Sequence, residues 1–196
     1  MNSIILGIDP GTRITGYGII KVGVSRLEPI DFGCIRPPVN LDLPQRYLAI
    51  FQGIEQLLDL YNPSALAVET QFVYKNVQSA LKLGGARTAV LLAAVKRNIP
   101  IFEYTPKKAK MAVVGHGGAS KEQVQKMIQL LLTLSSLPEP EDAADALSLA
   151  ICHAHTLAFN QRRSPCTPTS KGSSQKRPPQ KLLSKPKGSD LASLSP

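Results

Sequence analysis

The chain has 196 residues, enough for one well-packed core, and 43% of them are hydrophobic. Its formal net charge of +9 is uneven, because residues 161–196 carry eight Lys and Arg against one acid while the remainder is close to neutral. The chain has no apolar run of transmembrane length, no secretory signal pattern and three cysteines without disulfide or metal spacing, so we expect a cytoplasmic protein with no membrane partner.

Three strands are predicted in the first part of the chain, at residues 4–8, 17–22 and 30–35, joined by short Gly-containing connections. This pattern is typical of an antiparallel meander. Apolar residues then recur at helical spacing over 46–60, and Asn62-Pro63 ends that helix.

The later segments alternate between strand and helix periodicity. Strands are predicted at 65–69 and 100–104, and helices at 76–97, at 120–132 after the capping-box residues Ser120 and Gln123, and at 141–159. The loop 114–118 and the lysines that flank it are expected to form a flexible basic strip after the strand at 100–104. The order predicts an α/β domain over residues 1–160, with a five-stranded mixed sheet of three antiparallel strands and then parallel ones, flanked by helices.

From residue 161 onward the apolar pattern stops, and Ser, Pro, Lys and Gly dominate without any aromatic residue. Such a composition buries too little surface to offset the entropy of ordering, so we expect residues 161–196 to be a disordered basic tail. Its charge favours contact with a polyanion, although a role in solubility alone is the alternative.

Four carboxylates stand in positions where they could converge. Asp9 ends the first strand before the turn Pro10-Gly11-Thr12, Glu69 ends the fourth strand, and Asp142 and Asp145 are three apart on the last helix. Each acid alone is explained as well by a solvated strand end or by the dipole of a helix N-terminus. Together they favour a site for Mg²⁺ or Mn²⁺, where two ions could clamp a phosphodiester displacement.

Basic and aromatic residues lie near these acids in the sequence. Phe72 and Tyr74 follow Glu69 beside Lys75, where they could stack on unpaired bases or simply pack over the loop. Four lysines flank the loop 114–118, and either phosphate contact or an ordinary solvated surface explains them: Lys107, Lys108, Lys110 and Lys121. His153 and His155 lie too far along the last helix from Asp145 to bind the same metal, so we interpret them as structural.

Several motifs together resemble one family over residues 1–160. Residues 7–12 (GIDPGT), 15–18 (TGYG), 79–84 (SALKLG) and 142–147 (DAADAL) are similar to those of the bacterial Holliday-junction resolvases, the RuvC family. The resemblance implies an RNase H-like fold and a homodimer that binds a four-way DNA junction and nicks two strands of like polarity symmetrically. It also implies a role in DNA recombination and repair, with the RuvA–RuvB branch-migration complex as partner.

The same resemblance assigns roles to individual residues. The metal ligands, which are also catalytic, would be Asp9, Glu69, Asp142 and Asp145, holding two Mg²⁺ ions per subunit that Mn²⁺ could replace. Phe72 would stack on a base, and Lys110 and Lys121 would be the two important lysines of the family. Apart from the resemblance, we expect Lys107 of the basic strip to contact DNA as these two do, and Lys121 to offset charge that develops on the phosphate. Thr70 and Gln71 depart from the family pattern and leave the sequence preference of cleavage open.

Three other functions stay open at this point. One is an RNA-processing nuclease of the same fold, like the shorter YqgF-type proteins, which the 79–84 segment and the paired aspartates disfavour. Another is an ATPase of the actin and Hsp70 type, which needs a second nucleotide-binding lobe that 196 residues do not supply. The last is a junction-binding module without catalysis, which only a cleavage assay separates from a nuclease.

Overall fold

The computed structural model describes residues 3–24, 26–70 and 77–163, with side chains described up to residue 160. A single five-stranded sheet has the order β3-β2-β1-β4-β5. β1 (Ser3–Asp9), β2 (Thr15–Val22) and β3 (Leu27–Ile35) form the antiparallel meander, while β4 (Ala65–Glu69) runs parallel to β1 and β5 (Ile101–Tyr104) runs parallel to β4. The predicted mixed sheet is therefore confirmed.

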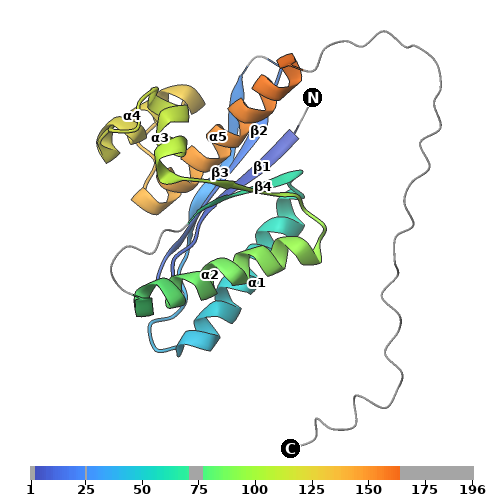
Figure 1. The fold of residues 1–196 in the computed structure, drawn as a ribbon, viewed down its shortest axis with the longest axis vertical. Helices are drawn as coiled ribbons and strands as arrows, with labels where there is room; N and C mark the ends of the chain where they lie inside the picture. The colour runs from blue at the N-terminus through green and yellow to red at the C-terminus, as the bar shows by residue number, and fades with distance from the viewer. Residues whose placement is uncertain (1–2, 25, 71–76, 164–196) are drawn as a thin grey trace, which may run out of the picture. The chain divides into compact units, whose positions relative to one another are not determined.

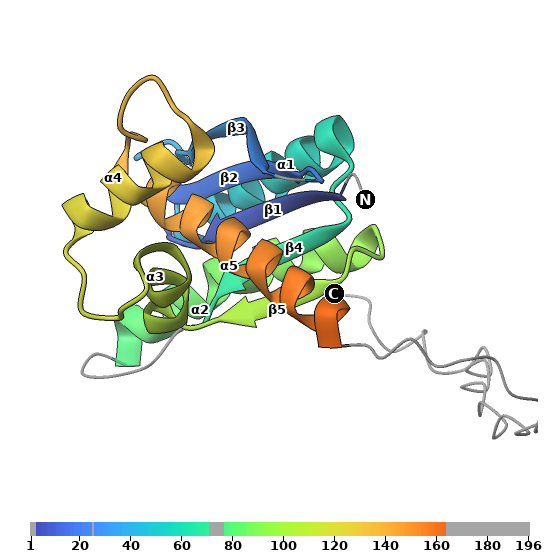
Figure 2. The ribbon, with the colours of Figure 1, turned by 90° about the horizontal axis from the view of Figure 1, so that it is seen from above.

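Helices cover both faces of this sheet (Figures 1 and 2). α1 (Leu43–Tyr61) and α2 (Val77–Lys96) pack on one face, where buried side chains such as Ile8, Ile54 and Val90 form one core cluster. α3 (Pro106–Val114), α4 (Lys121–Leu132) and α5 (Glu141–Arg163) pack on the other, around Ile5 and Leu147. Within the described residues, no helix combines the length and hydrophobicity that crossing a bilayer requires.

The prediction of a flexible basic strip after the fifth strand is wrong for residues 106–114, which form α3. The Thr105 side chain accepts a hydrogen bond from the backbone N–H of Lys108, and Pro106 occupies the first turn, where its missing N–H costs nothing. Gly115, with φ of 82°, ends the helix in a left-handed conformation. The helix escaped prediction because only Ala109 and Val113 of its nine residues are buried, which leaves no long apolar stripe.

Two helix boundaries also differ from expectation. α1 begins at Leu43 because Asp42 and Gln45 form a capping box there, three residues before the predicted start. α5 continues to Arg163, beyond the predicted end at residue 159. The capping box of Ser120 and Gln123 at the start of α4 is confirmed.

Candidate active site

Asp9 and Glu69 lie together at one end of the sheet. β1 and β4 are parallel neighbours in which Ile8 pairs with Val68, so the next residue of each strand is one of these two acids. Ligands and catalytic groups of α/β sheets collect beyond such carboxyl ends. The convergence expected of these two carboxylates is therefore present.

Glycines in β1 and β2 allow α5 to lie directly on the same end of the sheet. A Cβ atom on Gly16 would stand 2.0 Å from the Asp142 carbonyl oxygen, and one on Gly7 would stand 2.1 Å from that of Ala146. No side chain fits in either gap, so the helix backbone rests on the strand backbone. This close packing brings Asp142 and Asp145, in the first turns of α5, to the ends of β1 and β4.

A cavity of about 210 Å³ forms where these elements meet. Asp9, Glu69 and Asp145 line it, together with Lys110 of α3 and Lys121 of α4. Asp142 is not among its lining residues, although its charge is close enough to raise the pKa of Asp9. The structure thus brings three of the four predicted ligands into one cavity and places the fourth beside it.

Burial and mutual repulsion shape the protonation of these acids. Burial first, and then the negative charges of Glu69 and the aspartates of α5, raise the pKa of Asp9 to about 8. Burial and the charge of Asp145 raise the pKa of Glu69 to about 7, and Lys110 opposes that shift. The pKa of Asp145 is also raised, mainly by burial. Carboxylates crowded in this way gain from any cation that shares the cavity.

The donor set fits a hard divalent cation, because carboxylate oxygens are the ligands that Mg²⁺ and Mn²⁺ prefer. Among the described residues, however, no three His, Cys, Asp or Glu side chains form a ready-made cation cage. The acids line the cavity without closing around a point. Their chemistry fits the ion, whose positive charge would offset both the burial and the mutual repulsion that raise the pKa values of Asp9 and Glu69.

The two lysines of the cavity are held differently. Lys121 Nζ lies 2.5 Å from Oε2 of Glu141, the first residue of α5, in an ion pair that is more than half exposed. Lys110 Nζ lies 3.5 Å from the carbonyl oxygen of Ala119 and has no acid partner among the described ion pairs. Glu141 was not among the predicted site residues. Only its position next to Asp142, in the first turn of α5, could have indicated that it lies near the site.

The remaining predicted residues lie elsewhere. Lys107 is exposed on α3 and does not line the cavity, and Phe72 falls outside the described residues. His153 is buried, with its Nδ1 atom 2.7 Å from the Tyr104 hydroxyl and its ring centroid 4.1 Å from that of Phe102. Burial lowers the pKa of His153 to about 4, which suits the structural role expected for it.

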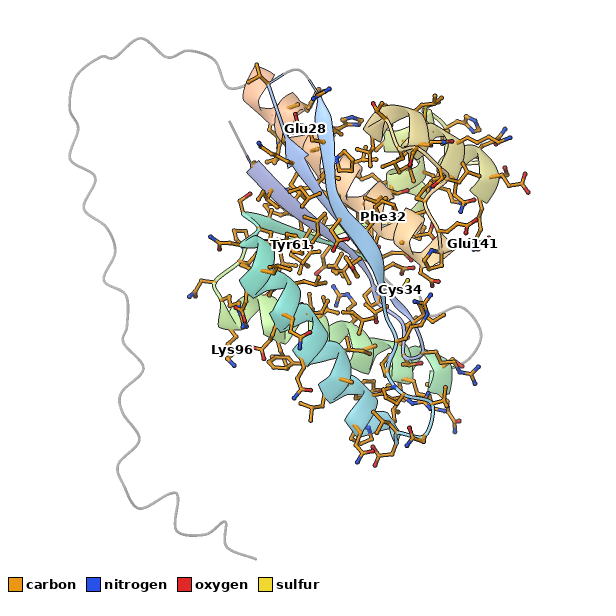
Figure 3. All side chains as sticks on the ribbon, turned by 180° about the vertical axis from the view of Figure 1, so that it is seen from behind. Glu28, Phe32, Cys34, Tyr61, Lys96 and Glu141 are labelled. Atoms are coloured by element: carbon orange, nitrogen blue, oxygen red, sulfur yellow. The ribbon has the colours of Figure 1, made fainter. Side chains whose placement is uncertain are left out.

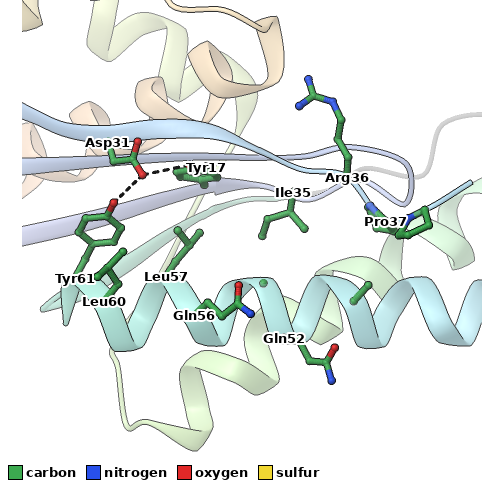
Figure 4. A pocket seen from close by; sticks show the side chains of 13 residues that line it. Tyr17, Asp31, Ile35, Arg36, Pro37, Gln52, Gln56, Leu57, Leu60 and Tyr61 are labelled. Carbon is green, nitrogen blue, oxygen red and sulfur yellow. Dashed lines mark hydrogen bonds between the residues drawn. The ribbon is translucent and has the colours of Figure 1, made fainter.

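A larger hollow, about 510 Å³, lies between β3 and α1 (Figure 4). Its acid, Asp31, accepts hydrogen bonds from the hydroxyls of Tyr17 at 3.2 Å and Tyr61 at 2.7 Å. Those bonds fix the carboxylate to β2 and α1. The hollow therefore offers no cluster of acids, and we place the chemistry in the smaller cavity.

An RNase H-like sheet with acids gathered at the ends of β1, β4 and α5, beside two lysines, defines a nuclease of that fold class. A family profile described as "Crossover junction endodeoxyribonuclease RuvC" matches residues 5–153. The chain belongs to this RuvC family of crossover junction endodeoxyribonucleases.

Individual relatives are similar over most of their length. The enzyme of that name from Protochlamydia amoebophila is 63% identical over 158 residues, which is 81% of this chain and 94% of the relative. The one from Dehalococcoides mccartyi is 47% identical over 155 residues, or 79% and 93% of the two chains. A solved structure of T. thermophilus RuvC in complex with a Holliday junction substrate superposes with a TM-score of 0.76 at 33% identity, covering 81% of this chain and 96% of that one.

Proposed function

We propose that this chain is an endonuclease that resolves Holliday junctions and that the acid cavity is its catalytic centre. The observation that carries the proposal is the meeting of Asp9, Glu69 and Asp145 with Lys110 and Lys121 in one cavity. Acids and lysines that face one another at strand ends are suited to holding a phosphodiester and the cations that accompany it.

The four acids would hold divalent metal ions, with Mg²⁺ as the expected metal, two per subunit, and Mn²⁺ as a substitute. When bound, such ions polarise the scissile phosphate and lower the pKa of the attacking water. Asp9 and Glu69 are fixed by β1 and β4, whereas Asp142 and Asp145 are fixed by the docking of α5. The ligand set is thus built on rigid elements, which favours pre-organised electrostatic stabilisation.

Lysine side chains would add positive charge to that of the metal ions. Lys121 and Lys110 reach the cavity from α4 and α3, where they can offset negative charge that develops on the phosphate. Lys107, exposed on α3, extends this basic side toward the DNA. Phe72 follows Glu69 closely enough in sequence to stack on a base at the crossover, as the sequence analysis expected.

A homodimer is the assembly that two symmetric cuts require. One face of α2 is suited to forming it, because exposed apolar side chains recur there at helical spacing: Val77, Leu81, Leu92 and Val95 are 65%, 70%, 56% and 61% exposed. Gly84 and Thr88 continue the same stripe. A partner copy would bury this apolar stripe of α2. We also propose that the protein works with the RuvA–RuvB complex and that it is located in the cytoplasm.

The deciding experiment incubates the purified chain with an end-labelled mobile four-way junction and Mg²⁺. Paired nicks in two strands of like polarity, with a linear duplex of the same sequence left intact, are expected. Binding of the junction without any cut would instead identify a non-catalytic junction-binding module. Preferential cutting of structured RNA would favour the RNA-processing alternative.

A further inference from the structure

A second group of cations lies around the connection that follows Asp9, and the proposed function gives these residues no role. Arg13, Arg36 and Arg46 line a hollow of about 550 Å³ beside Pro37. Arg13 and Arg46 also line an adjoining hollow of about 530 Å³ with Lys82. Because the two hollows share Arg13 and Arg46, they form one continuous surface, here named the arginine groove.

No ion pair of the described residues neutralises the cations of this groove. Neither hollow has an Asp or Glu among its described lining residues, and no salt bridge among the described residues involves Arg13, Arg36 or Lys82. Arg46 donates to the carbonyl oxygens of Val39 at 2.7 Å and Leu41 at 2.9 Å, which fixes the groove wall. Four cations gathered on one surface create a local field that attracts a polyanion.

Arg13 is tied closely to the catalytic acids. It follows Asp9 by four residues in a turn that Thr15 fixes, because the Thr15 hydroxyl donates to the Gly11 carbonyl oxygen at 2.8 Å. Four residues span at most about 14 Å. Since B-DNA phosphates rise about 3.4 Å per step along a strand, Arg13 lies within a few base pairs of a phosphate held at Asp9.

Arg36 approaches the site from β3. It lies two residues beyond Cys34, whose thiol pKa is raised mainly by burial, lowered by the charge of Arg36 and raised by that of Asp142 in the first turn of α5. Figure 3 shows Cys34 on β3 near the start of α5, where Glu141 is labelled. In Figure 4 the Arg36 guanidinium extends away from α1, at the end of β3. The exposed Arg36 guanidinium is therefore open to a ligand at this end of the sheet.

The groove and the lysines come from opposite faces of the sheet. Lys110 and Lys121 belong to α3 and α4 on one face, whereas Arg46 and Lys82 belong to α1 and α2 on the other. Basic groups thus come from both faces of the sheet, and a four-way junction has a duplex arm on each side of the strand to be cut.

We propose that the arginine groove binds the phosphate backbone of the duplex arm that continues from the scissile phosphate on the α1–α2 side. The inference rests on the proposed function and extends it, since it assigns a second DNA contact and its residues. Guanidinium groups bind phosphate oxygens in fork geometry, and contacts of this kind fix register without reading sequence. Arg13 and Arg36 are positioning residues on this proposal.

The test compares Arg13→Gln, Arg36→Gln and the double variant with the unaltered full chain. Arg26→Gln is the matched control, because Arg26 is an exposed arginine near the turn between β2 and β3, at the opposite end of the sheet from Asp9. Equilibrium binding of two immobile junctions of unrelated sequence is measured in metal-free buffer across a salt series. Circular dichroism melting verifies that each variant is folded.

Each arginine removed should raise the dissociation constant about three- to tenfold on both junctions, and the double variant should flatten the slope of log K against log salt by about 2. Arg26→Gln should match the unaltered chain. Unchanged affinity and slope in the double variant would overturn the proposal, as would a loss confined to one junction sequence or an equal loss in the control. The proposed DNA contact of the arginine groove and the proposed nuclease activity are tested separately, because cleavage by the unaltered chain with Mg²⁺ tests only the activity.

Discussion

The carboxyl group of Asp9 is the most strongly perturbed acid of the cavity. Its strand places it at the end of a buried run, and the later docking of α5 adds two further aspartates nearby. A lone acid at the end of a strand would stay solvated and ordinary. Burial in the folded protein, and then the charges of the neighbouring acids, therefore raise the pKa of Asp9, and a shift of this kind is typical of a functional site.

Changing Asp9 or Asp145 to the amide should remove a metal ligand while keeping the shape of the side chain. Cleavage should fall by about 10²–10³-fold or more, while junction binding persists, because catalysis depends on electrostatic stabilisation at the metals. Glu122→Gln is the control, since Glu122 is an exposed acid next to Lys121 outside the cavity. Near-normal cutting by both amide variants would refute the shared metal site.

The pKa values of about 8 for Asp9 and about 7 for Glu69 also predict how pH acts on the metal-free protein. Both exceed the ordinary values of 3.8 and 4.5, so the native state holds more protons than the unfolded state between roughly pH 4 and 8. These two groups must therefore lower the stability as pH rises through that window. Stabilisation by Mg²⁺ should grow over the same window, because the ion competes with protons.

Melting temperatures at pH 5, 6.5 and 8, with and without Mg²⁺, measure this effect. Asp9→Asn removes one of the titrating groups, so its metal-free melting temperature should exceed that of the unaltered chain by a margin that grows with pH. A margin that stays constant from pH 5 to pH 8 would contradict the assignment of a raised pKa to Asp9.

At the scale of the elements, the contact of α5 with β1 and β2 decides whether a site exists at all. α5 supplies two of the four acids, and only glycines beneath it allow the approach. The other two helices on that face, α3 and α4, bring Lys110 and Lys121 to the same cavity. A small displacement of α5 would separate the acids without unfolding the sheet.

Gly16→Ala should therefore damage catalysis more than stability. Its Cβ would stand 2.0 Å from the Asp142 carbonyl oxygen, so α5 must move at its catalytic end. Overpacking of this kind lowers the free energy of unfolding by about 1–3 kcal/mol, so the variant should still fold. Gly118→Ala is the control, because a Cβ there meets nothing within 4 Å. Full cleavage activity in Gly16→Ala would show that the placement of α5 tolerates such a shift.

The apolar stripe of α2 makes a prediction about assembly. Leu92→Glu places a charge in the proposed interface and should convert a dimer into a monomer in light scattering. Leu130→Glu on α4 is the matched control, since Leu130 is 72% exposed outside the stripe. A Leu92→Glu protein that keeps the dimer mass, or a control that loses it equally, would place the interface elsewhere.

At the scale of the whole molecule, charge is divided between a nearly neutral body and a basic terminal segment. The segment from residue 164 lies outside the described residues, so its predicted disorder stays a prediction. Deleting residues 161–196 should weaken junction binding at low salt. If two or three of its eight cations contact phosphates, the slope of log K against log salt should flatten by about 2 to 3.

A salt titration of the full chain against a chain ending at Asn160 makes that measurement. Equal slopes would mean that the segment does not engage DNA. A large loss of cleavage rate at saturating protein would show instead that it belongs to the working structure. Because the arginine groove is unchanged in both chains, the two contributions to the slope can be separated.

The sequence by itself determined the local pattern of this protein. Apolar periodicity located the five strands and most helices, and the capping box of Ser120 and Gln123 located one helix start. The motifs around Asp9 and Asp142 indicated both the ligand types and the family. Local signals suffice here because strand and helix periods, caps and turns depend on neighbouring residues. α3 was missed for the same reason, since its apolar face is too short to give a period.

Only the tertiary structure decided which side chains meet. It placed Asp9, Glu69 and Asp145 in one cavity with Asp142 beside it, paired Lys121 with Glu141, and joined Arg13 and Arg36 in a groove from separate connections. These contacts join residues far apart in the chain, and they depend on the sheet order and on how closely α5 docks. The raised pKa values follow from the same packing, because burial and neighbouring charges exist only after the distant segments have come together.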